Sequence, residues 1–585
     1  MPYSWEILAL LAAAAGLWLH KRKKWSPPTP ASWESRRWDW ILAAGCALVG
    51  GVSLFVLWGR TATHLAPSGA DFEGYYLGAM AFERDSFDLY VLDRYPGFPW
   101  LASLFASSPQ TIHRAGALVN MFAISLAAIP LYFVGRSLGG RAAGVLGALL
   151  ALRMSVVLDL GHSFTHYPLA AATDCLLLAL LLSLVRTRCI WTALGMGAAG
   201  ALAVSCDPKQ AVFVLGVFGV GLLGVVTGKQ AIRKKIIAAV LLFLPLVLLN
   251  QAVMRLPVEL FSLEEVATRV QLHFEVTEAL RQAGDTGFRL GEPWSLFKLP
   301  GSLWLTATGL SPEAGQPGVI APLALEAMPV VYGNTSMWWV LLFPALLVSL
   351  ALKREEGWWL RLLACLLPLV MAWPVFHMHY QHRYFLGAAM ILPPLVVAGF
   401  SRWAGGLPLL LAGAVTLVFP TSPFSSVDES YLQRKEHRHD IWVGPEHGAD
   451  LETLAWAQES LPEDAVVYDL SERRPSAILS ASHPYVRCNQ TDDACAQQIV
   501  NQAGTRVAVL WAGEFLSGQL PGGPGTPPTR AEEGEGIPTS FGECWEQVRW
   551  LNPDAGVFQY NCDTPPIAHP RRTPPPPEPR WHSRF

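Results

Sequence analysis

The sequence has few charged residues, few cysteines and no excess of positive charge. Charged side chains make up 15% of the 585 residues, against roughly 25% in soluble domains, and the mean hydropathy is +0.31. This composition excludes a soluble globular protein and a disordered chain. The 9 Cys residues are too few for a disulfide scaffold of this length. Lys and Arg number 43 against 46 Asp and Glu, so no basic field exists to hold nucleic acid.

Long apolar runs are what the chain has instead. A membrane-spanning helix needs about 20 mostly apolar residues, and 52% of this chain is hydrophobic. The pattern predicts a mainly α-helical, polytopic membrane bundle with about twelve spans. These spans are expected near residues 3–20, 39–59, 113–134, 142–160, 168–185, 190–206, 209–227, 236–254, 336–352, 358–375, 384–400 and 404–420.

Positive charge predicts the orientation of these spans. Counting along the chain, every basic cluster falls on the same side of the membrane, which should be the cytoplasmic side. The clusters lie at 21–24, 36–37, 136–141, 186–188, 229–235, 353–361 and 402. We therefore predict a multi-pass protein of a bacterial-type cytoplasmic (inner) membrane, with both termini extracytoplasmic. The first run has its charges after the apolar stretch, which favours a retained anchor over a signal peptide.

The composition divides the chain into four parts. They are an N-terminal anchor helix and connector (1–38), a transmembrane domain (39–420) with outer loops at 60–112 and 255–335, an extracytoplasmic α/β domain (421–570), and a disordered Pro-rich tail (571–585). In the α/β domain, helices are expected at 451–460 and 495–504 and strands at 465–470 and 506–512, because helical spacing alternates there with short apolar runs.

Four cysteines lie in the predicted outer domain. An even number on the oxidising side permits two disulfides, and sequence-near pairing would join Cys488 to Cys495 and Cys544 to Cys562. Zinc is the alternative, but no CxxC spacing supports it.

Two carboxylates in the first outer loop are candidate catalytic residues. Asp71 and Glu73 precede a stretch with the spacing of an amphipathic helix suited to the membrane surface, which includes Tyr75, Tyr76 and Met80. Such a pair suits a general base or a divalent cation such as Mg²⁺ or Mn²⁺, although nothing completes a ligand set. The alternative is structural, with Asp71 capping the helix and Glu73 favouring its dipole.

Two further outer segments carry polar groups that could contact a sugar or an acceptor. Arg94 and Tyr95 begin a rigid aromatic turn, RYPGFPWL, whose alternative role is an interfacial anchor. His162 and His166 precede the span near 168–185, and hydrogen bonding to a sugar or phosphate is favoured for them. Their i, i+4 spacing would suit zinc, but no third ligand is evident, so no metal site is expected.

Cationic residues also lie in two other polar stretches that join neighbouring predicted spans on the outer side of the membrane. Asp207 and Lys209 lie in SCDPKQAV, a Pro-broken gap between two apolar runs, and an ionisable pair at such a place indicates function unless the lysine merely snorkels to the interface. His379, His382, Arg383 and Tyr384 crowd the turn between two late spans. Such a cluster suits a phosphate, because Arg makes bidentate contacts and the next helix N-terminus adds a positive dipole. A metal site or an interfacial belt is the alternative.

Carboxylates and a turn rich in cationic residues on the same side of the membrane fit the transfer of a sugar from a lipid-linked phosphate. A sugar on a polyprenyl phosphate needs fixed positive charge for its leaving group and a base for the acceptor hydroxyl. Displacement then inverts the anomeric centre. No Gly-rich phosphate loop or Walker motif is present, as expected if the donor is lipid-linked.

The chain resembles the GT-C superfamily of membrane glycosyltransferases. It is most similar to the branch of protein-O-mannosyltransferase-like and aminoarabinose-transferase-like proteins, over roughly residues 39–420. The resemblance rests on an acidic motif before EGYYL, on RYPGFPWL, on HYPLAAATD and on HRYFL followed by PP. It implies an enzyme that moves a hexosyl or pentosyl group from a polyprenyl-phosphate donor to a glycan, lipid or protein acceptor.

The resemblance also assigns roles to single residues. It makes an Asp the base, which Asp71 could supply, while Glu73 matches the second acid of the family. Phe72 stands where the family usually has Asp, so a catalytically degenerate scaffold stays an alternative. Arg383 and Tyr384 match a late Arg-Tyr pair at a lipid-phosphate site, with His382 and Lys209 as further candidates. A transporter or flippase of lipid-linked glycans is the other alternative.

Overall fold

The structure is a computed structural model, and it describes the helical bundle and parts of the C-terminal region. The described residues are 36–60, 72–84, 95–152, 155–187, 189–207, 210–228, 230–253, 346–352, 357–378, 386–404, 456–457, 459–462, 464–469, 479–487, 508–512, 540–541, 545–552 and 555–560.

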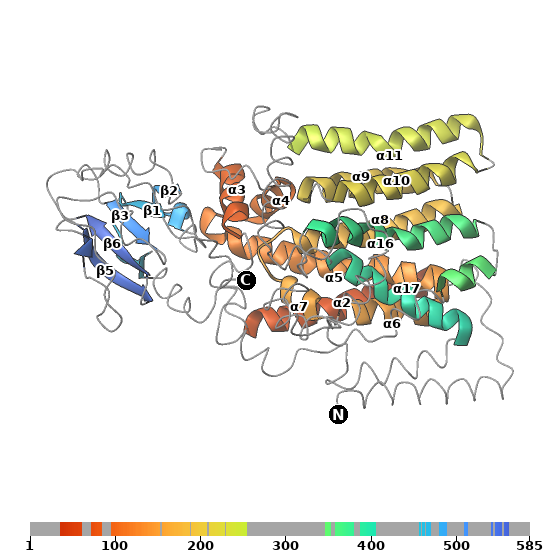
Figure 1. The fold of residues 1–585 in the computed structure, drawn as a ribbon, viewed down its shortest axis with the longest axis horizontal. Helices are drawn as coiled ribbons and strands as arrows, with labels where there is room; N and C mark the ends of the chain where they lie inside the picture. Colours follow the sequence, from red (N-terminus) through yellow and green to blue (C-terminus); the bar gives the residue numbers. More distant parts are fainter. Residues whose placement is uncertain are drawn as a thin grey trace, which may run out of the picture.

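Apolar helices of different lengths make up the bundle, and the long ones run side by side (Figure 1). The bundle helices are α2 (Arg36–Arg60), α5 (Ile112–Gly139), α6 (Arg141–Leu152), α7 (Ser155–Leu160), α8 (Tyr167–Thr187), α9 (Ile190–Cys206), α10 (Gln210–Val226), α11 (Ile232–Val253), α16 (Trp358–Met378) and α17 (Leu386–Ala404). In the described part, 4 helices are long and apolar enough to cross a membrane: Arg37–Val56, Ile112–Gly139, Tyr167–Thr187 and Leu386–Trp403.

Most of the predicted spans coincide with these helices. The span predicted at 142–160 is divided between α6 and α7. The span predicted at 336–352 is described as helix only over 346–352, and the spans predicted at 3–20 and 404–420 lie outside the described residues. The count of about twelve therefore stays a prediction.

Helix α5 lies at the centre of the bundle, where it packs against α2, α6, α8 and α17. Small residues let these helices approach closely. A Cβ on Gly135 would lie 2.6 Å from the carbonyl oxygen of Ala143, and one on Gly147 would lie 2.5 Å from the Cα of Pro394. Such contacts supply van der Waals packing, which holds helices together where lipid removes the hydrophobic driving force.

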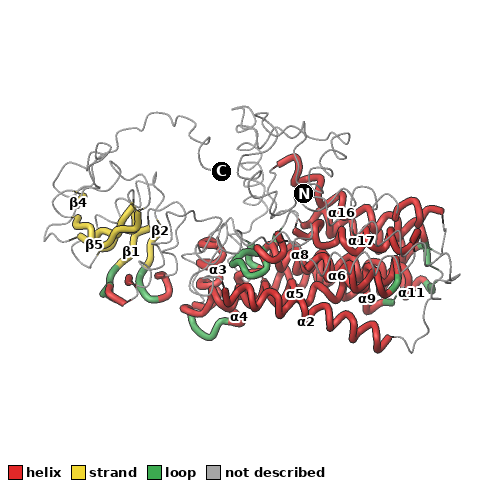
Figure 2. Tube along the Cα trace, turned by 90° about the horizontal axis from the view of Figure 1, so that it is seen from below, coloured by secondary structure: helices red, strands yellow, loops and turns green. Residues whose placement is uncertain are grey.

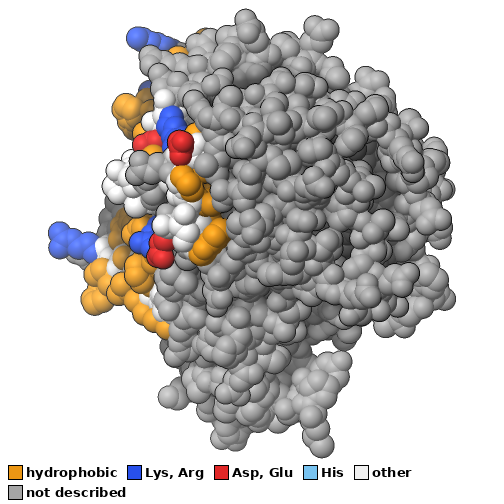
Figure 3. Space-filling view, turned by 90° about the vertical axis from the view of Figure 1, so that its left-hand side faces the viewer, with side chains coloured by type: hydrophobic (Ala, Val, Ile, Leu, Met, Phe, Trp, Pro, Cys, Tyr) orange, Lys and Arg blue, Asp and Glu red, His pale blue; other side chains and the backbone are white. Residues whose placement is uncertain are grey.

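Helix α2 keeps a large apolar face exposed. Trp38 is 62% exposed and Leu48 is 68% exposed, and Val52 and Phe55 belong to the same surface. Figure 3, which looks onto the end of the molecule that carries the sheet, likewise shows hydrophobic side chains over much of the described surface in view. A face of this kind on an apolar helix fits contact with lipid.

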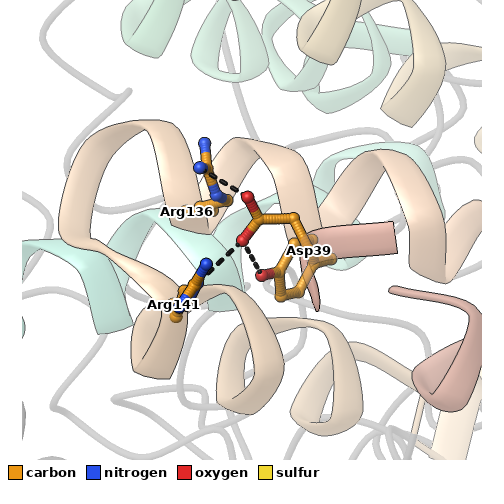
Figure 4. A network of polar contacts seen from close by, with 4 residues as sticks. Asp39, Arg136 and Arg141 are labelled. Atoms are coloured by element: carbon orange, nitrogen blue, oxygen red, sulfur yellow. Dashed lines mark hydrogen bonds and ion pairs between the residues drawn. The ribbon is translucent and has the colours of Figure 1, made fainter. Parts of the chain in front are cut away.

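One end of the bundle is held by ion pairs (Figure 4). Asp39 at the start of α2 pairs with Arg136 of α5 at 2.6 Å and with Arg141 of α6 at 2.9 Å. Tyr132 donates a further hydrogen bond of 2.9 Å to Asp39. Nearby, Arg402 at the end of α17 donates a 2.9 Å hydrogen bond to the carbonyl of Leu138 at the end of α5. This is the end predicted to face the cytoplasm.

Two shorter helices cover the opposite end of the bundle. They are α3 (Phe72–Arg84) and α4 (Gly97–Phe105), which pack against each other and against α5. A 3₁₀ turn, η3 (Pro109–Thr111), leads into α5. Figure 1 shows α3 and α4 between the bundle and the sheet.

The C-terminal region forms a six-stranded sheet. Its strands are β1 (Val466–Asp469), β2 (Tyr485–Arg487), β3 (Ala508–Ala512), β4 (Ser540–Phe541), β5 (Trp545–Asn552) and β6 (Ala555–Tyr560), in the order β2-β1-β3-β6-β5-β4. β1 is parallel to β2 and β3, and the other pairs are antiparallel. β1 and β3 coincide with the two predicted strands, and residues 456–457 and 459–460 are helical within the helix predicted at 451–460.

The sheet region packs directly on α3, beside it in Figure 2. Buried side chains of Leu461 and Leu479 belong to one apolar cluster with Tyr76 and Leu77 of α3. At the end of α3, Arg84 donates a 3.0 Å hydrogen bond to the carbonyl of Ala481. Helix α3 is therefore held between the membrane bundle and the sheet.

Candidate functional site

Several predicted site residues lie outside the described residues. They are Asp71, Arg94, Lys209, His379, His382, Arg383, Tyr384 and the cysteines 488, 495, 544 and 562. Glu73 belongs to the first turn of α3, and only its backbone is described. Tyr95, His162 and His166 are described with their side chains.

Helix α3 forms where the amphipathic stretch was predicted, but its surroundings differ from the expectation. Tyr75, Tyr76 and Met80 were expected along the membrane surface, and they are instead 2%, 0% and 1% exposed. The rings of Phe98 and Phe164 pack against them, with Tyr75 and Phe98 5.8 Å apart and Tyr76 and Phe164 6.1 Å apart. The apolar face of α3 is thus covered by protein, because α4, α5 and the sheet region all reach it.

A buried polar chain joins α3 to two other segments. The hydroxyl of Tyr75 is hydrogen-bonded to Nδ1 of His166, and Nε2 of the same ring lies 3.4 Å from Oδ2 of Asp207. His166 immediately precedes α8, and Asp207 is the C-cap of α9. Both ring nitrogens of His166 therefore have a hydrogen-bonding partner within the protein, and the His166 side chain is 7% exposed.

The turn that carries both histidines is fixed by Asn120 of α5. The Asn120 amide donates hydrogen bonds of 2.7 Å to the carbonyls of Ser163 and Thr165. His162 contacts the carbonyl of Leu158 through Nδ1 at 3.1 Å. Asn120 was not predicted, although a lone amide inside an apolar span is a signal of a structural or functional role.

A second carboxylate lies close to this polar chain. Asp174 in α8 is fully buried, and its electrostatic neighbours are Asp207 and Gln210 at the start of α10. Two carboxylates in one buried region are costly unless a proton or a cationic group offsets their charge. His166 can supply such a charge when protonated, because its ring contacts Asp207 directly.

Tyr76 contributes a second hydroxyl on the same helix. It donates a 3.4 Å hydrogen bond to the carbonyl of Pro109 at the start of η3. Burial raises the pKa of Tyr76 above its usual value, because the surrounding protein disfavours the phenolate. The hydroxyl therefore stays protonated and serves as a donor rather than as a base.

The described residues hold no group of three His, Cys, Asp or Glu side chains that could bind a metal ion. The cation suggested for Asp71 and Glu73 stays a prediction, because neither side chain is described. Five cysteines of the described part are free thiols, and Cys46, Cys175, Cys206 and Cys365 are buried as small apolar groups. The two predicted disulfides lie outside the described residues.

Comparison with known proteins finds one family and several solved folds. The family described as dolichyl-phosphate-mannose-protein mannosyltransferase matches residues 93–252, which is less than half of the chain. ArnT from Cupriavidus metallidurans, in a crystal structure bound to undecaprenyl phosphate, has a TM-score of 0.52 at 12% sequence identity. The match covers 91% of this chain and 99% of ArnT. No curated protein matches the sequence.

A more distant similarity connects the chain to the archaeal oligosaccharyltransferase AglB from Archaeoglobus fulgidus. Its TM-score is 0.43 at 13% identity, and the match covers 82% of this chain and 70% of AglB. The ArnT similarity shows the fold alone. Together with the family match, it confirms the predicted resemblance to the GT-C superfamily, in the branch of ArnT and the protein mannosyltransferases. The chain is a helical membrane protein with this fold.

Proposed function

We propose that this chain is an integral-membrane glycosyltransferase that takes its sugar from a polyprenyl phosphate. The acceptor is a hydroxyl group on a glycan, lipid or protein at the outer face of the membrane, and the anomeric centre is inverted. The fold of ArnT supports this proposal, since ArnT was crystallised with undecaprenyl phosphate. A donor of this class would reach the site from the bilayer.

One observation supports the proposal: α3 and α17, the helices that follow the two predicted halves of the site in the sequence, begin at the same end of the bundle. Helix α3 begins at Phe72, directly after Asp71, and packs near the start of α5. Helix α17 begins at Leu386, two residues after Tyr384, and its far end contacts Leu138 at the far end of α5. The two helices α5 and α17 thus run in the same direction, which supports placing the acids and the cationic turn on one side.

In the proposed reaction, a carboxylate of Asp71 or Glu73 takes the proton of the acceptor hydroxyl as its oxygen attacks the anomeric carbon. The bond from that carbon to the phosphate oxygen breaks, and polyprenyl phosphate leaves. Fixed positive charge from Arg383 and Lys209, with His382 and Tyr384 nearby in sequence, would stabilise the leaving phosphate. Arg94, Tyr95, His162 and His379 are candidates for contacts to the sugar or the acceptor.

The test is sugar transfer by the full-length chain in proteoliposomes. Undecaprenyl phosphates carrying radiolabelled mannose, galactose, arabinose or aminoarabinose serve as donors, and a membrane extract from cells lacking the chain serves as acceptor. Released undecaprenyl phosphate and the labelled product are both measured, with and without EDTA to test for a divalent cation. Glu73→Ala and Arg383→Ala should each reduce transfer by roughly 10²-fold or more, the range for loss of a general base or a charge-stabilising group.

A matched control is available on the same helix. Glu83 lies in the last turn of α3 and is exposed, so Glu83→Ala changes the same type of side chain away from the proposed base and should keep wild-type transfer. Full activity in Asp71→Ala, Glu73→Ala and Arg383→Ala together would refute the mechanism. Movement of the lipid-linked sugar across the bilayer without a new glycosidic bond would identify a transporter instead.

A further inference from the structure

The Tyr75–His166–Asp207 chain joins three segments that are far apart in sequence. Tyr75 and His166 are separated by 91 residues, and His166 and Asp207 by 41. We propose that these three side chains are positioning residues that hold the first turn of α3, and with it Glu73, in its place on the bundle. This proposal rests on the glycosyl transfer proposed above, and it assigns His166 a role through Tyr75 instead of direct contact with the sugar.

Burial of these three side chains makes the hydrogen bonds between them hard to replace, so the bonds constrain where the side chains lie. Tyr75, His166 and Asp207 are 2%, 5% and 7% exposed, so water cannot easily replace a lost partner. The ring of Phe98 packs edge-on against Tyr75, and the rings of Tyr75 and His166 are 5.1 Å apart. In such a low-dielectric place, an unsatisfied polar group costs more than it would at the surface. The three side chains are therefore expected to keep one mutual arrangement.

The hydrogen-bond chemistry is satisfied by a neutral imidazole. With the proton on Nε2, that N–H donates to the Asp207 carboxylate, which lies 3.4 Å away, and Nδ1 accepts the hydroxyl hydrogen of Tyr75. A carboxylate behind a histidine fixes both the tautomer and the orientation of the ring. Asp207 thus orients His166, and His166 in turn orients Tyr75.

Tyr75 is close enough to the candidate acid to control its position. It follows Glu73 by two residues on one helix, which corresponds to about 3 Å along the helix axis at 1.5 Å per residue. A misplacement of about 1 Å in a reacting group can reduce a rate by about 10²-fold. Loss of a single hydroxyl should displace α3 less than this, so we expect about a tenfold decrease in kcat for Tyr75→Phe.

Tyr76 provides a matched control next to Tyr75. It is 0% exposed and lies on the same helix, but its hydroxyl bonds the Pro109 carbonyl at 3.4 Å instead of reaching His166. Tyr76→Phe therefore removes the same hydroxyl group from an equally buried tyrosine whose 3.4 Å hydrogen bond goes to the Pro109 carbonyl and not to His166. A decrease in rate that results only from a buried hydroxyl being lost would affect both variants alike.

The experiment measures kcat, KM and thermal stability of Tyr75→Phe and Tyr76→Phe in proteoliposomes with the donor that the wild type uses. We expect kcat to fall about tenfold in Tyr75→Phe with KM within twofold, and both values to stay within twofold of wild type in Tyr76→Phe. His166→Asn, which keeps an amide near the place of Nδ1, should retain more kcat than His166→Ala. An unchanged kcat in Tyr75→Phe, a change confined to KM, or an equal fall of kcat in Tyr76→Phe would overturn the proposal.

A second measurement does not depend on sugar transfer. Glu73→Cys is introduced into the full-length protein, and the rate at which a membrane-impermeant maleimide labels this position is compared between Tyr75→Phe and Tyr76→Phe. Labelling several-fold faster with Tyr75→Phe, and unchanged with Tyr76→Phe, supports the positioning role even if no transfer is found, in which case only the proposed function fails. Equal labelling in both backgrounds overturns the positioning role, whatever the activity of the wild type.

Discussion

Removal of the Asp39 carboxylate should weaken the packing of three helices at once. The Asp39 side chain is 2% exposed and contacts Arg136 at 2.6 Å and Arg141 at 2.9 Å, so it joins α2 to α5 and α6 (Figure 4). Tyr132 adds a neutral hydrogen bond of 2.9 Å. In Asp39→Ala, two guanidinium groups and one hydroxyl lose their shared acceptor.

The magnitude follows from the exposure of the two arginines. Breaking a fully buried pair costs about 3–5 kcal/mol, and breaking an exposed pair costs about 0.2–1 kcal/mol. The side chains of Arg136 and Arg141 are 23% and 41% exposed, so water can take over part of the lost interaction. We therefore expect Asp39→Ala to lower the free energy of unfolding by about 2–3 kcal/mol, between those limits. Arg136→Ala should cost more than Arg141→Ala because Arg136 is less exposed.

The assay is thermal unfolding of the full-length chain in a mild detergent, read by intrinsic fluorescence at two salt concentrations. Arg186→Ala is the matched control, because Arg186 is an exposed arginine in the last turn of α8. Asp39→Asn, which keeps the shape and one acceptor, should lie between Asp39→Ala and wild type. An Asp39→Ala variant as stable as Arg186→Ala, or a larger loss in Arg141→Ala than in Arg136→Ala, would refute the reasoning.

Two further predictions concern packing and the docking of the sheet. Gly147→Ala should destabilise the bundle by about 1–3 kcal/mol, because the new Cβ would lie 2.5 Å from the Cα of Pro394. Gly219→Ala is the control for the same unfolding measurement, since a Cβ there would meet no atom of another element within 4 Å and the helix should be unaffected or more stable. Arg84→Ala removes the 3.0 Å hydrogen bond to the carbonyl of Ala481, and limited proteolysis should cut the C-terminal region faster than in Glu83→Ala; equal cutting would contradict the contact.

The helical bundle could be predicted because hydropathy is a local property. Runs of about 20 apolar residues predict spans wherever they occur, and α2, α5, α6, α8, α9, α10 and α11 lie at the expected places. Helix α4 was not predicted, because the Pro-containing sequence RYPGFPWL indicated a turn where the structure has a helix from Gly97. In the sheet region, β1 and β3 were predicted from apolar runs, whereas β2 and β4–β6 were not predicted. The longest of these, β5, mixes polar with apolar residues and therefore forms no apolar run.

The candidate site could be predicted only in part. His166 was selected from its place before a span, but its partners Tyr75 and Asp207 come from segments 91 and 41 residues away. The spacing of α3 showed an amphipathic helix without showing what covers its apolar face, because the periodicity of apolar residues describes one helix alone and not its neighbours. The sheet region covers that face, so the membrane surface was the wrong partner for Tyr75 and Tyr76.

The sequence by itself determined that this chain is a helical membrane protein, where most of its described apolar helices lie, and which segments carry acids or cations. Those properties follow from composition and short-range spacing, because the residues of each segment decide by themselves whether it lies in lipid or in water. Only the tertiary structure decided that Asp39 holds three helices together, that α3 lies between the bundle and the sheet, and that Tyr75, His166 and Asp207 form one chain. These contacts depend on which helix faces lie together, and no local pattern encodes the pairing of side chains that are distant in sequence.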